Sequence, residues 1–234
     1  MNKLLIIFLG AQGSGKTTNA LLLKRRLSKL GYKVVLTKAI HYTILLKLWH
    51  RFVAILTGRK VSYRFRPNGS IEEFVEPSLL KRLISLDYIV SLASAVISAL
   101  KIRFLLMMFP IVIEHEGFIF NQLVYLLFIY RRLVNEEVLL RKYRTLLSFI
   151  PKNVLVIFLD VSKLRPEDLY FRYHKRGSLS EPWYYVKFQT HIYRALAQVS
   201  RKSVILDASM DPVSLSNLIF NFVIQDLCGE NFLC

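Results

Sequence analysis

The sequence predicts an α/β fold, in which a mostly parallel, five-stranded sheet lies between layers of helices. Five short apolar runs alternate with stretches of helical periodicity, a pattern typical of parallel sheets whose faces are both covered. Hydrophobic residues make up 53% of the 234 residues, which is enough for a large buried core. A glycine-rich stretch also lies between the first apolar run and the first helical stretch, where a strand would pass directly into a helix.

The N-terminal half is predicted to contain three of the strands. The run Leu4–Leu9 is typical of a buried strand, and Lys16–Leu30 has the periodicity of a helix that ends at Gly31. The elements expected next are a strand over 33–37, an apolar helix over 40–56, an Arg-, Gly- and Pro-rich loop over 58–77 with room for a small hairpin, a helix over 77–102 and a strand over 111–114. The run 88–100 is apolar or small throughout, but Lys101 and Arg103 follow it, so no uncharged run reaches the ~18 residues of a membrane span. A buried helix followed by a buried strand is favoured.

The C-terminal half continues the alternation. The expected elements are a helical region over 118–149 with a break near Asn135, a strand over 153–160, helices over 166–175 and 183–199, a strand over 203–206 and a helix over 212–227. No repeat, low-complexity segment or linker interrupts the chain. We therefore expect one domain over residues 1–234, with a small lid at about 172–184.

The charge of the chain is unevenly distributed. Lys and Arg number 33 against 16 Asp and Glu, a net charge of +17. Residues 1–70 contain 14 of the basic residues and no acidic ones, and the first carboxylate is Glu72. This distribution favours an anionic partner, such as a phosphate, a nucleic acid or an anionic membrane. Any chemistry that needs a carboxylate must take it from residue 72 or later.

The cysteines and the N-terminus favour an intracellular protein. Cys228 and Cys234 form neither a spaced metal-binding set nor a disulfide framework. The apolar run near Met1 is too short for the core of a signal peptide. We expect a cytoplasmic location, with peripheral association at a membrane as the alternative.

Residues 10–17, GAQGSGKT, match the pattern G-x-x-x-x-G-K-[ST] at every fixed position. Glycines allow the backbone to curl so that its N–H groups cradle phosphate oxygens, and the following helix N-terminus adds positive potential. Lys16 is expected to reach the β- and γ-phosphates, and the Thr17 hydroxyl to bind Mg²⁺. The motif predicts a P-loop that binds ATP or GTP.

Several segments resemble thymidylate kinases and related nucleoside monophosphate kinases. They are FLGAQGSGKTT at 8–18, LGYKVVLT at 30–37, LDV at 159–161, RYHKRG at 172–177 and LDAS at 206–209 followed by Asp211 and Pro212. The resemblance implies a P-loop three-layer fold, ATP and Mg²⁺ as cofactors, and transfer of the γ-phosphoryl group to a nucleoside monophosphate or a similar small acceptor. The implied ATP-binding residues are Gly10, Gln12, Gly13, Ser14, Gly15, Lys16, Thr17, Thr18 and, in the loop against the adenine, Ala208.

The departures from this family concentrate where the acceptor would bind. Leu9 replaces a Glu before the first loop glycine, Gln12 replaces a charged residue, and Lys38-Ala39-Ile40 replaces Arg-Glu-Pro. The third strand ends in IEHEG at 113–117 instead of Asp-Arg and an aromatic residue. We therefore expect retained ATP-side chemistry and a rebuilt acceptor side, with 38–110 as the divergent region.

Four further residues are candidates for catalysis or metal binding. Arg172 and Arg176 lie four apart on one face of a predicted helix, and as lid arginines they could close over the triphosphate. Glu114 and Glu116 lie at the carboxyl end of the third strand, where ligands bind in open parallel sheets, with His115 on the opposite side. Glu114 is the candidate for Mg²⁺ and Glu116 for the acceptor proton. Asp160 ends the next strand and could position either ligand.

Two other functions are compatible with the same sequence. The basic N-terminal third suits an ATP-binding protein that acts at a nucleic acid or a membrane, and a kinase relative could bind nucleotide without turnover. The alternation YRFRP at 63–67 could stack bases, although a strand with one apolar face is favoured. The helix predicted over 40–56 could cover the sheet, lie on a membrane surface or form a homodimer contact.

Overall fold

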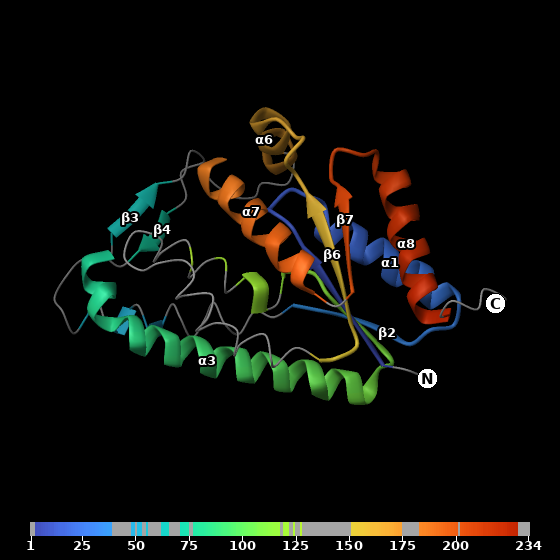
Figure 1. The fold of residues 1–234 in the computed structure, drawn as a ribbon, viewed down its shortest axis with the longest axis horizontal. Coiled ribbons are helices and arrows are strands. Elements are labelled where there is room, and N and C mark those ends of the chain that lie inside the picture. The colour runs from blue at the N-terminus through green and yellow to red at the C-terminus, as the bar shows by residue number, and fades with distance from the viewer. Residues whose placement is uncertain are drawn as a thin grey trace.

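The computed structural model describes residues 3–38, 62–65, 71–74, 77–117, 151–174, 183–200 and 202–228, with short pieces at 48–49, 51–52, 55, 119–121, 124 and 127. Five strands of this part of the chain form one sheet (Figure 1): β1 (Leu4–Leu9), β2 (Val34–Thr37), β5 (Ile111–Glu114), β6 (Val154–Asp160) and β7 (Ser203–Asp207). Their order is β2-β5-β1-β6-β7, and every pairing is parallel. The predicted five-stranded α/β sheet is confirmed.

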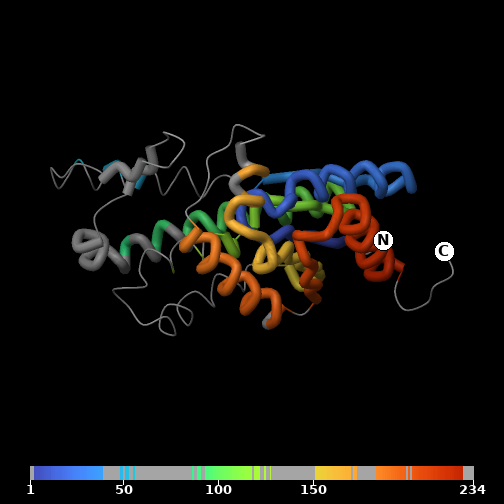
Figure 2. Tube along the Cα trace, turned by 90° about the horizontal axis from the view of Figure 1, so that it is seen from above, coloured from blue at the N-terminus to red at the C-terminus, as the bar shows by residue number. Residues whose placement is uncertain are grey.

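Helices cover both faces of this sheet. The described helices are α1 (Lys16–Lys29), α3 (Pro77–Met108), α6 (Pro166–His174), α7 (Trp183–Val199) and α8 (Pro212–Cys228). Helices α1 and α8 pack together over one core, and α3 and α7 contribute to the core on the other face. In Figure 2, α1 (blue) and α7 (orange) lie on opposite sides of the strands. The fold therefore has three layers.

Strand β1 occupies the centre of the sheet and is buried along its whole length. Leu4, Ile6 and Phe8 belong to the core beneath α1 and α8, whereas the alternate residues Leu5 and Ile7 belong to the core beneath α3 and α7. A strand buried on both faces needs apolar residues at every position, which explains the unbroken run LLIIFL. The loop that follows β1 is thus anchored to the central, fully buried strand of the sheet.

The first helix ends in a Schellman motif, as Gly31 predicted. The Gly31 N–H donates to the Ser28 carbonyl at 3.0 Å, and the Tyr32 N–H donates to the Leu27 carbonyl at 3.1 Å. Gly31 adopts φ 87°, a left-handed conformation that costs glycine little. This turn directs the chain from α1 into β2.

Helix α3 is longer than the sequence indicated, because it continues past residue 102 to Met108. Lys101 and Arg103 do not end it, since Lys101 is only half-buried and Arg103 is exposed. The Lys101 Nζ donates to the Lys38 carbonyl at 2.8 Å. The helix ends shortly before Pro110, whose ring disfavours helical geometry in the residue before it. Among the described residues, no helix is long and apolar enough to cross a membrane.

The loop predicted over 58–77 contains a hairpin. Strand β3 (Ser62–Phe65) pairs antiparallel with β4 (Ile71–Phe74), with Tyr63 opposite Glu73. This confirms the strand interpretation of residues 63–65, whereas Arg66 and Pro67 lie outside the described residues.

Two predicted helices are described only in part. Of the region 40–56, residues 48–49, 51–52 and 55 are helical, and Trp49 packs against the core beneath α3 and α7. Of the region 118–149, residues 119–121, 124 and 127 are helical, and Ile119, Phe120, Val124 and Leu127 are buried in that same core. The predicted break near Asn135 lies outside the described residues.

Candidate active site

The loop between β1 and α1 curls because of its glycines. Gly10, Gly13 and Gly15 have φ values of 142°, 80° and 93°, which side-chain-bearing residues rarely adopt. A Cβ atom on Gly10 would lie 2.7 Å from both the Leu159 carbonyl oxygen and the Ser14 Oγ. Strand β6 and the loop itself therefore leave space only for glycine at position 10. The backbone can approach a ligand closely along this stretch.

Lys16, the first residue of α1, folds back over the loop. Its Nζ donates to the carbonyl oxygens of Gly10 at 2.6 Å and Ala11 at 2.9 Å. The first turn of α1 contains no acidic residue, and the N-cap, Gly15, has no side chain that could cap the helix. An ammonium group and the N–H groups of a helix start thus lie together, an arrangement that binds anions.

The other predicted loop residues differ in accessibility. Gln12 and Thr17 are exposed, Thr18 is half-buried, and Ser14 is buried. Asn19, one turn into α1, is also buried and donates from Nδ2 to the Gly15 carbonyl at 3.1 Å. This contact supports the last loop glycine from inside the helix. Sequence reasoning did not single out Asn19, because it lies outside the motif.

Strand β5 ends beside the loop. Glu114 pairs in register with Ile7 of β1 and Thr37 of β2, and its side chain is fully buried. Its Oε1 accepts a hydrogen bond from the Glu116 backbone N–H at 3.0 Å. Glu116 lies beyond the end of the strand, is 42% exposed at its side chain and pairs with the Lys38 Nζ at 3.0 Å. The two carboxylates therefore share one edge but differ strongly in environment.

His115, between these carboxylates, is buried. Its Nδ1 lies 3.0 Å from the Thr37 carbonyl, which can only accept, so Nδ1 carries the proton. Burial lowers the pKa of His115, and Lys38 and Lys16 lower it further against the opposing influence of Glu116. A neutral imidazole at pH 7 follows.

Arg172 and Ala208, predicted from different segments, contact each other. The Arg172 Nη1 donates to the Ala208 carbonyl at 3.1 Å, and the Ala208 N–H donates to the Asp160 carbonyl at 2.8 Å. Helix α6, the end of β6 and the turn after β7 are thereby joined. Arg176 lies outside the described residues, as does most of the predicted lid.

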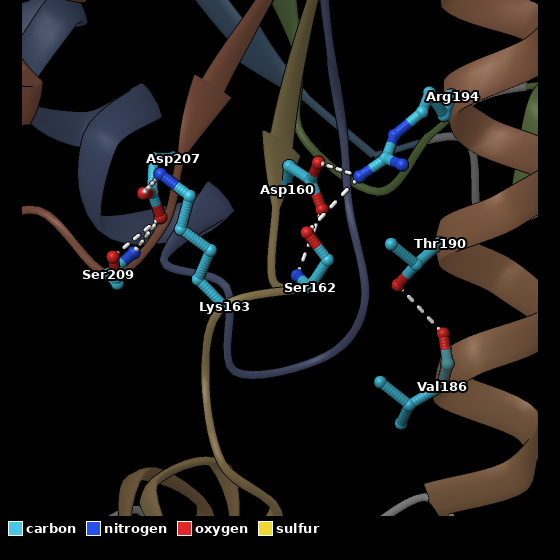
Figure 3. A network of polar contacts seen from close by, with 8 residues as sticks. All are labelled: Asp160, Ser162, Lys163, Val186, Thr190, Arg194, Asp207 and Ser209. Atoms are coloured by element: carbon cyan, nitrogen blue, oxygen red, sulfur yellow. Dashed lines mark hydrogen bonds and ion pairs between the residues drawn. The ribbon is translucent and has the colours of Figure 1, made fainter.

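A polar corner surrounds the carboxyl ends of β6 and β7 (Figure 3). We define it as Asp160, Ser162, Lys163, Arg194, Asp207 and Ser209. Asp160 forms an ion pair with Arg194 of α7 and accepts from the Ser162 N–H at 2.9 Å. Asp207 accepts from the Ser209 Oγ at 2.6 Å and pairs with the Lys163 Nζ at 2.9 Å.

The two carboxylates of the corner are held by different contacts. Asp160 and Asp207 are register partners, and each has its own cation. Hydrogen bonds from Ser209, together with the Lys163 ammonium, lower the pKa of Asp207 to about 2. Sequence reasoning identified Asp160 but not Arg194 or Lys163. Neither residue lies in a motif, and no spacing rule connects residue 160 to residue 194.

The residues expected to bind Mg²⁺ suit that ion chemically. The described residues contain no group of three or more His, Cys, Asp or Glu side chains that could form a metal cage. Mg²⁺ does not require one, because it keeps several waters and shares substrate phosphates with one or two protein oxygens. The Thr17 hydroxyl and the Glu114 carboxylate provide oxygens of this kind at the same edge of the sheet.

Comparison with known proteins relates the chain to kinases by fold alone. No protein-family model matches the sequence, and no curated protein matches it. Among solved structures, the chain is similar to a deoxyadenosine kinase from M. mycoides with bound dCTP, at a TM-score of 0.55 and 17% identity. The similarity covers 94% of this chain and 99% of that one. This finding establishes the P-loop kinase fold and leaves the thymidylate kinase family itself a prediction.

Proposed function

We propose that this protein is an ATP-dependent phosphotransferase that transfers the γ-phosphoryl group to a small acceptor. One observation carries the proposal: the loop over residues 10–17 joins a central buried strand to a helix, and the Lys16 ammonium lies over that loop. In P-loop enzymes this geometry places the lysine and the backbone N–H groups on the β- and γ-phosphates. The kinase fold of the solved neighbour supports the same reaction class.

ATP binding would require Lys16 to exchange partners. Its Nζ now donates to two loop carbonyls, and in the complex it would donate to phosphate oxygens instead. Thr17 and Glu114 would hold Mg²⁺, which neutralises charge on the β- and γ-phosphates when it is bound. Arg172, already linked to the Ala208 carbonyl beside the proposed adenine loop, would supply positive charge from the lid side.

We infer that a hydroxyl group, such as a nucleoside presents, suits the acceptor edge better than a phosphate monoester. The described groups at the end of β5 are the carboxylates Glu114 and Glu116, and Lys38 is already paired with Glu116. Like charge would repel an acceptor phosphate at this edge. The hydroxyl oxygen would attack the γ-phosphorus, the bond to the bridging oxygen would break, and Glu116 would take the hydroxyl proton. The solved neighbour is, by its title, a kinase of deoxyadenosine.

The test of the reaction class is an acceptor screen that measures ADP production with Mg²⁺. The panel contains nucleosides and nucleoside monophosphates, with Lys16→Ala as the blank and Lys29→Ala as the matched control at the exposed end of α1. We expect Lys16→Ala to lower kcat/KM at least about 100-fold and Lys29→Ala to leave it unchanged. Absence of ADP production with every acceptor would reject the kinase and favour a nucleotide-binding relative without turnover.

The test of the acceptor class is Glu116→Gln. If a hydroxyl is the acceptor, loss of the base should lower kcat by about 100-fold or more, with KM little changed. Glu167→Gln, on the exposed first turn of α6, is the matched control. If nucleoside monophosphates are the better substrates and Glu116→Gln has no effect on kcat, the hydroxyl acceptor is wrong although the kinase stands.

A further inference from the structure

The helical stretch within residues 40–56 exposes several large apolar side chains. Leu48, Phe52 and Ile55 follow the spacing i, i+4, i+7, which places them on one side of a helix. Their exposed fractions are 56%, 52% and 78%. We call these three residues the apolar ridge. Single exposed apolar residues are common on soluble proteins, but several that share one face mark a surface that contacts a partner.

The contacts of Trp49 explain why the ridge is exposed. Trp49 is half-buried and packs against the core beneath α3 and α7. Its ring centre lies 6.0 Å from that of Phe52. Successive residues of a helix are rotated by about 100°, so the side chain that holds the helix on the core and the ridge occupy different sides of it. The exposure of the ridge therefore follows from the way in which this helix docks on the rest of the protein.

The segment that carries the ridge is strongly basic. Residues 1–70 contain 14 Lys and Arg residues and no Asp or Glu. Arg51 is exposed on the same helical stretch, and Lys47, Arg59 and Lys60 are close to it in the sequence. Basic groups are attracted to the headgroups of anionic lipids, and large apolar side chains enter the boundary between headgroups and acyl chains. The combination of charge and apolar surface is thus complementary to an anionic bilayer.

Two other partners match only part of this surface. A nucleic acid would attract the basic residues, but Leu48 and Ile55 are aliphatic and offer no ring on which a base could stack. A second copy of the chain could cover the apolar side chains, but it would bring together two segments that each carry an excess of 14 positive charges. An anionic bilayer accommodates both the apolar and the basic groups.

We propose that the apolar ridge docks this protein on the surface of an anionic lipid bilayer, with Leu48, Phe52 and Ile55 at the acyl boundary and Arg51 at the headgroups. Because a short apolar face alone binds membranes weakly, the attachment is reversible and depends on the added attraction of the basic residues. The inference does not depend on the proposed reaction, since none of these residues belongs to the candidate active site.

Co-sedimentation of the full chain with lipid vesicles tests the proposal. In about 50 mM NaCl we expect binding to phosphatidylserine–phosphatidylcholine vesicles and little binding to vesicles of phosphatidylcholine alone. Raising the salt to about 500 mM NaCl should weaken the binding by at least about 10-fold, because it screens the attraction between basic side chains and anionic headgroups.

Two pairs of variants separate the apolar from the basic contribution. Ile55→Ser should lower the affinity for the anionic vesicles by at least about 10-fold. Val213→Ser is the matched control, since Val213 is 70% exposed on α8. Arg51→Gln should lower the affinity by about 5-fold, and Lys152→Gln, which is exposed just before β6, should leave it unchanged. The circular dichroism spectrum and Tm of each variant show whether it is folded.

A fluorescent label shows whether the ridge itself enters the bilayer. Ile55→Cys, with Cys228→Ser and Cys234→Ser in the background, is labelled with an environment-sensitive fluorophore such as NBD. Its emission should shift to the blue when anionic vesicles are added, because the label leaves water. Val213→Cys, labelled in the same background, should show no shift.

Several outcomes would overturn the proposal. The wild-type chain could fail to sediment with anionic vesicles, or its binding could be unaffected by Ile55→Ser. A label at residue 55 that stays in water on bound vesicles would also contradict it. If Ile55→Ser instead abolishes binding to a single-stranded oligonucleotide, or halves the mass of a dimer in sedimentation equilibrium, the ridge belongs to that partner and the bilayer is wrong.

Discussion

The glycine-rich loop and the polar corner occupy the same edge of one sheet but are built in opposite ways. The loop is contiguous, lying within residues 10–17, and steric constraints on its backbone decide its shape. The corner joins Asp160, Arg194, Lys163 and Asp207 from separate segments through charge and hydrogen bonds. Steric overlap is a hard, short-range constraint, whereas ion pairs near the surface are screened by solvent. Substitutions in the loop should therefore lower the free energy of unfolding much more than substitutions in the corner.

The largest expected effect on stability is the cost of an alanine at one of two glycines that both have a left-handed backbone. Gly10→Ala should lower the free energy of unfolding by on the order of 3 kcal/mol, because its Cβ would overlap the Leu159 carbonyl and the Ser14 Oγ, each at 2.7 Å. Gly31→Ala should cost only about 1 kcal/mol, because nothing lies within 4 Å of its Cβ and conformational strain alone remains. Urea unfolding of both variants measures the difference. Equal costs would contradict the steric account of the loop.

The same contrast explains how far the sequence predicts the molecule. The five strands and the loop were predictable because each depends on a local pattern, such as the run LLIIFL or the spacing of glycines and Lys16. The continuation of α3 from residue 102 to Met108 was not, because no local pattern in the sequence distinguishes these residues from a connection to the next strand.

Long-range contacts also limit how much of the candidate site can be predicted from the sequence. Arg26 illustrates this, since in the sequence it is one of the 14 basic residues of positions 1–70 whose excess favoured an anionic partner. Its guanidinium instead donates to the Ser216 carbonyl and the Asn217 Oδ1 and lies 3.8 Å from the centre of the Phe220 ring. Nothing at residue 26 indicates a contact with α8, about 190 residues later. Similarly, the spacing of Glu114 and Glu116 does not reveal that one is buried and the other exposed.

A moderate loss of stability is expected when Asp207 is replaced, and this loss should depend on pH. The folded-state pKa of about 2 lies below the ordinary value of 3.8, so the ionised carboxylate stabilises the fold above pH 4 and loses this contribution as pH falls through 2. Asp207→Asn should cost about 1 kcal/mol at pH 7, a figure reduced because solvent screens a partly exposed group. The gap between variant and wild type should close between pH 4 and pH 2. Urea unfolding at several pH values measures it, and a gap independent of pH would assign the effect to packing.

The smallest effect is expected for the ion pair of Asp160 and Arg194, whose side chains are 13% and 45% exposed. Arg194→Met should cost about 0.5–1 kcal/mol, because Asp160 keeps its hydrogen bond from the Ser162 N–H when the guanidinium is gone. A double-mutant cycle with Asp160→Asn isolates the pair, and Arg165→Met, which breaks the more exposed pair with Asp168, is the control with a cost near zero. The cycle measures the coupling energy between the two side chains, and a small value would confirm that the corner contributes little to stability. A coupling energy as large as the cost of Gly10→Ala would mean that α7 is held to β6 as rigidly as the loop is held to β1, and the contrast between the two regions would then fail.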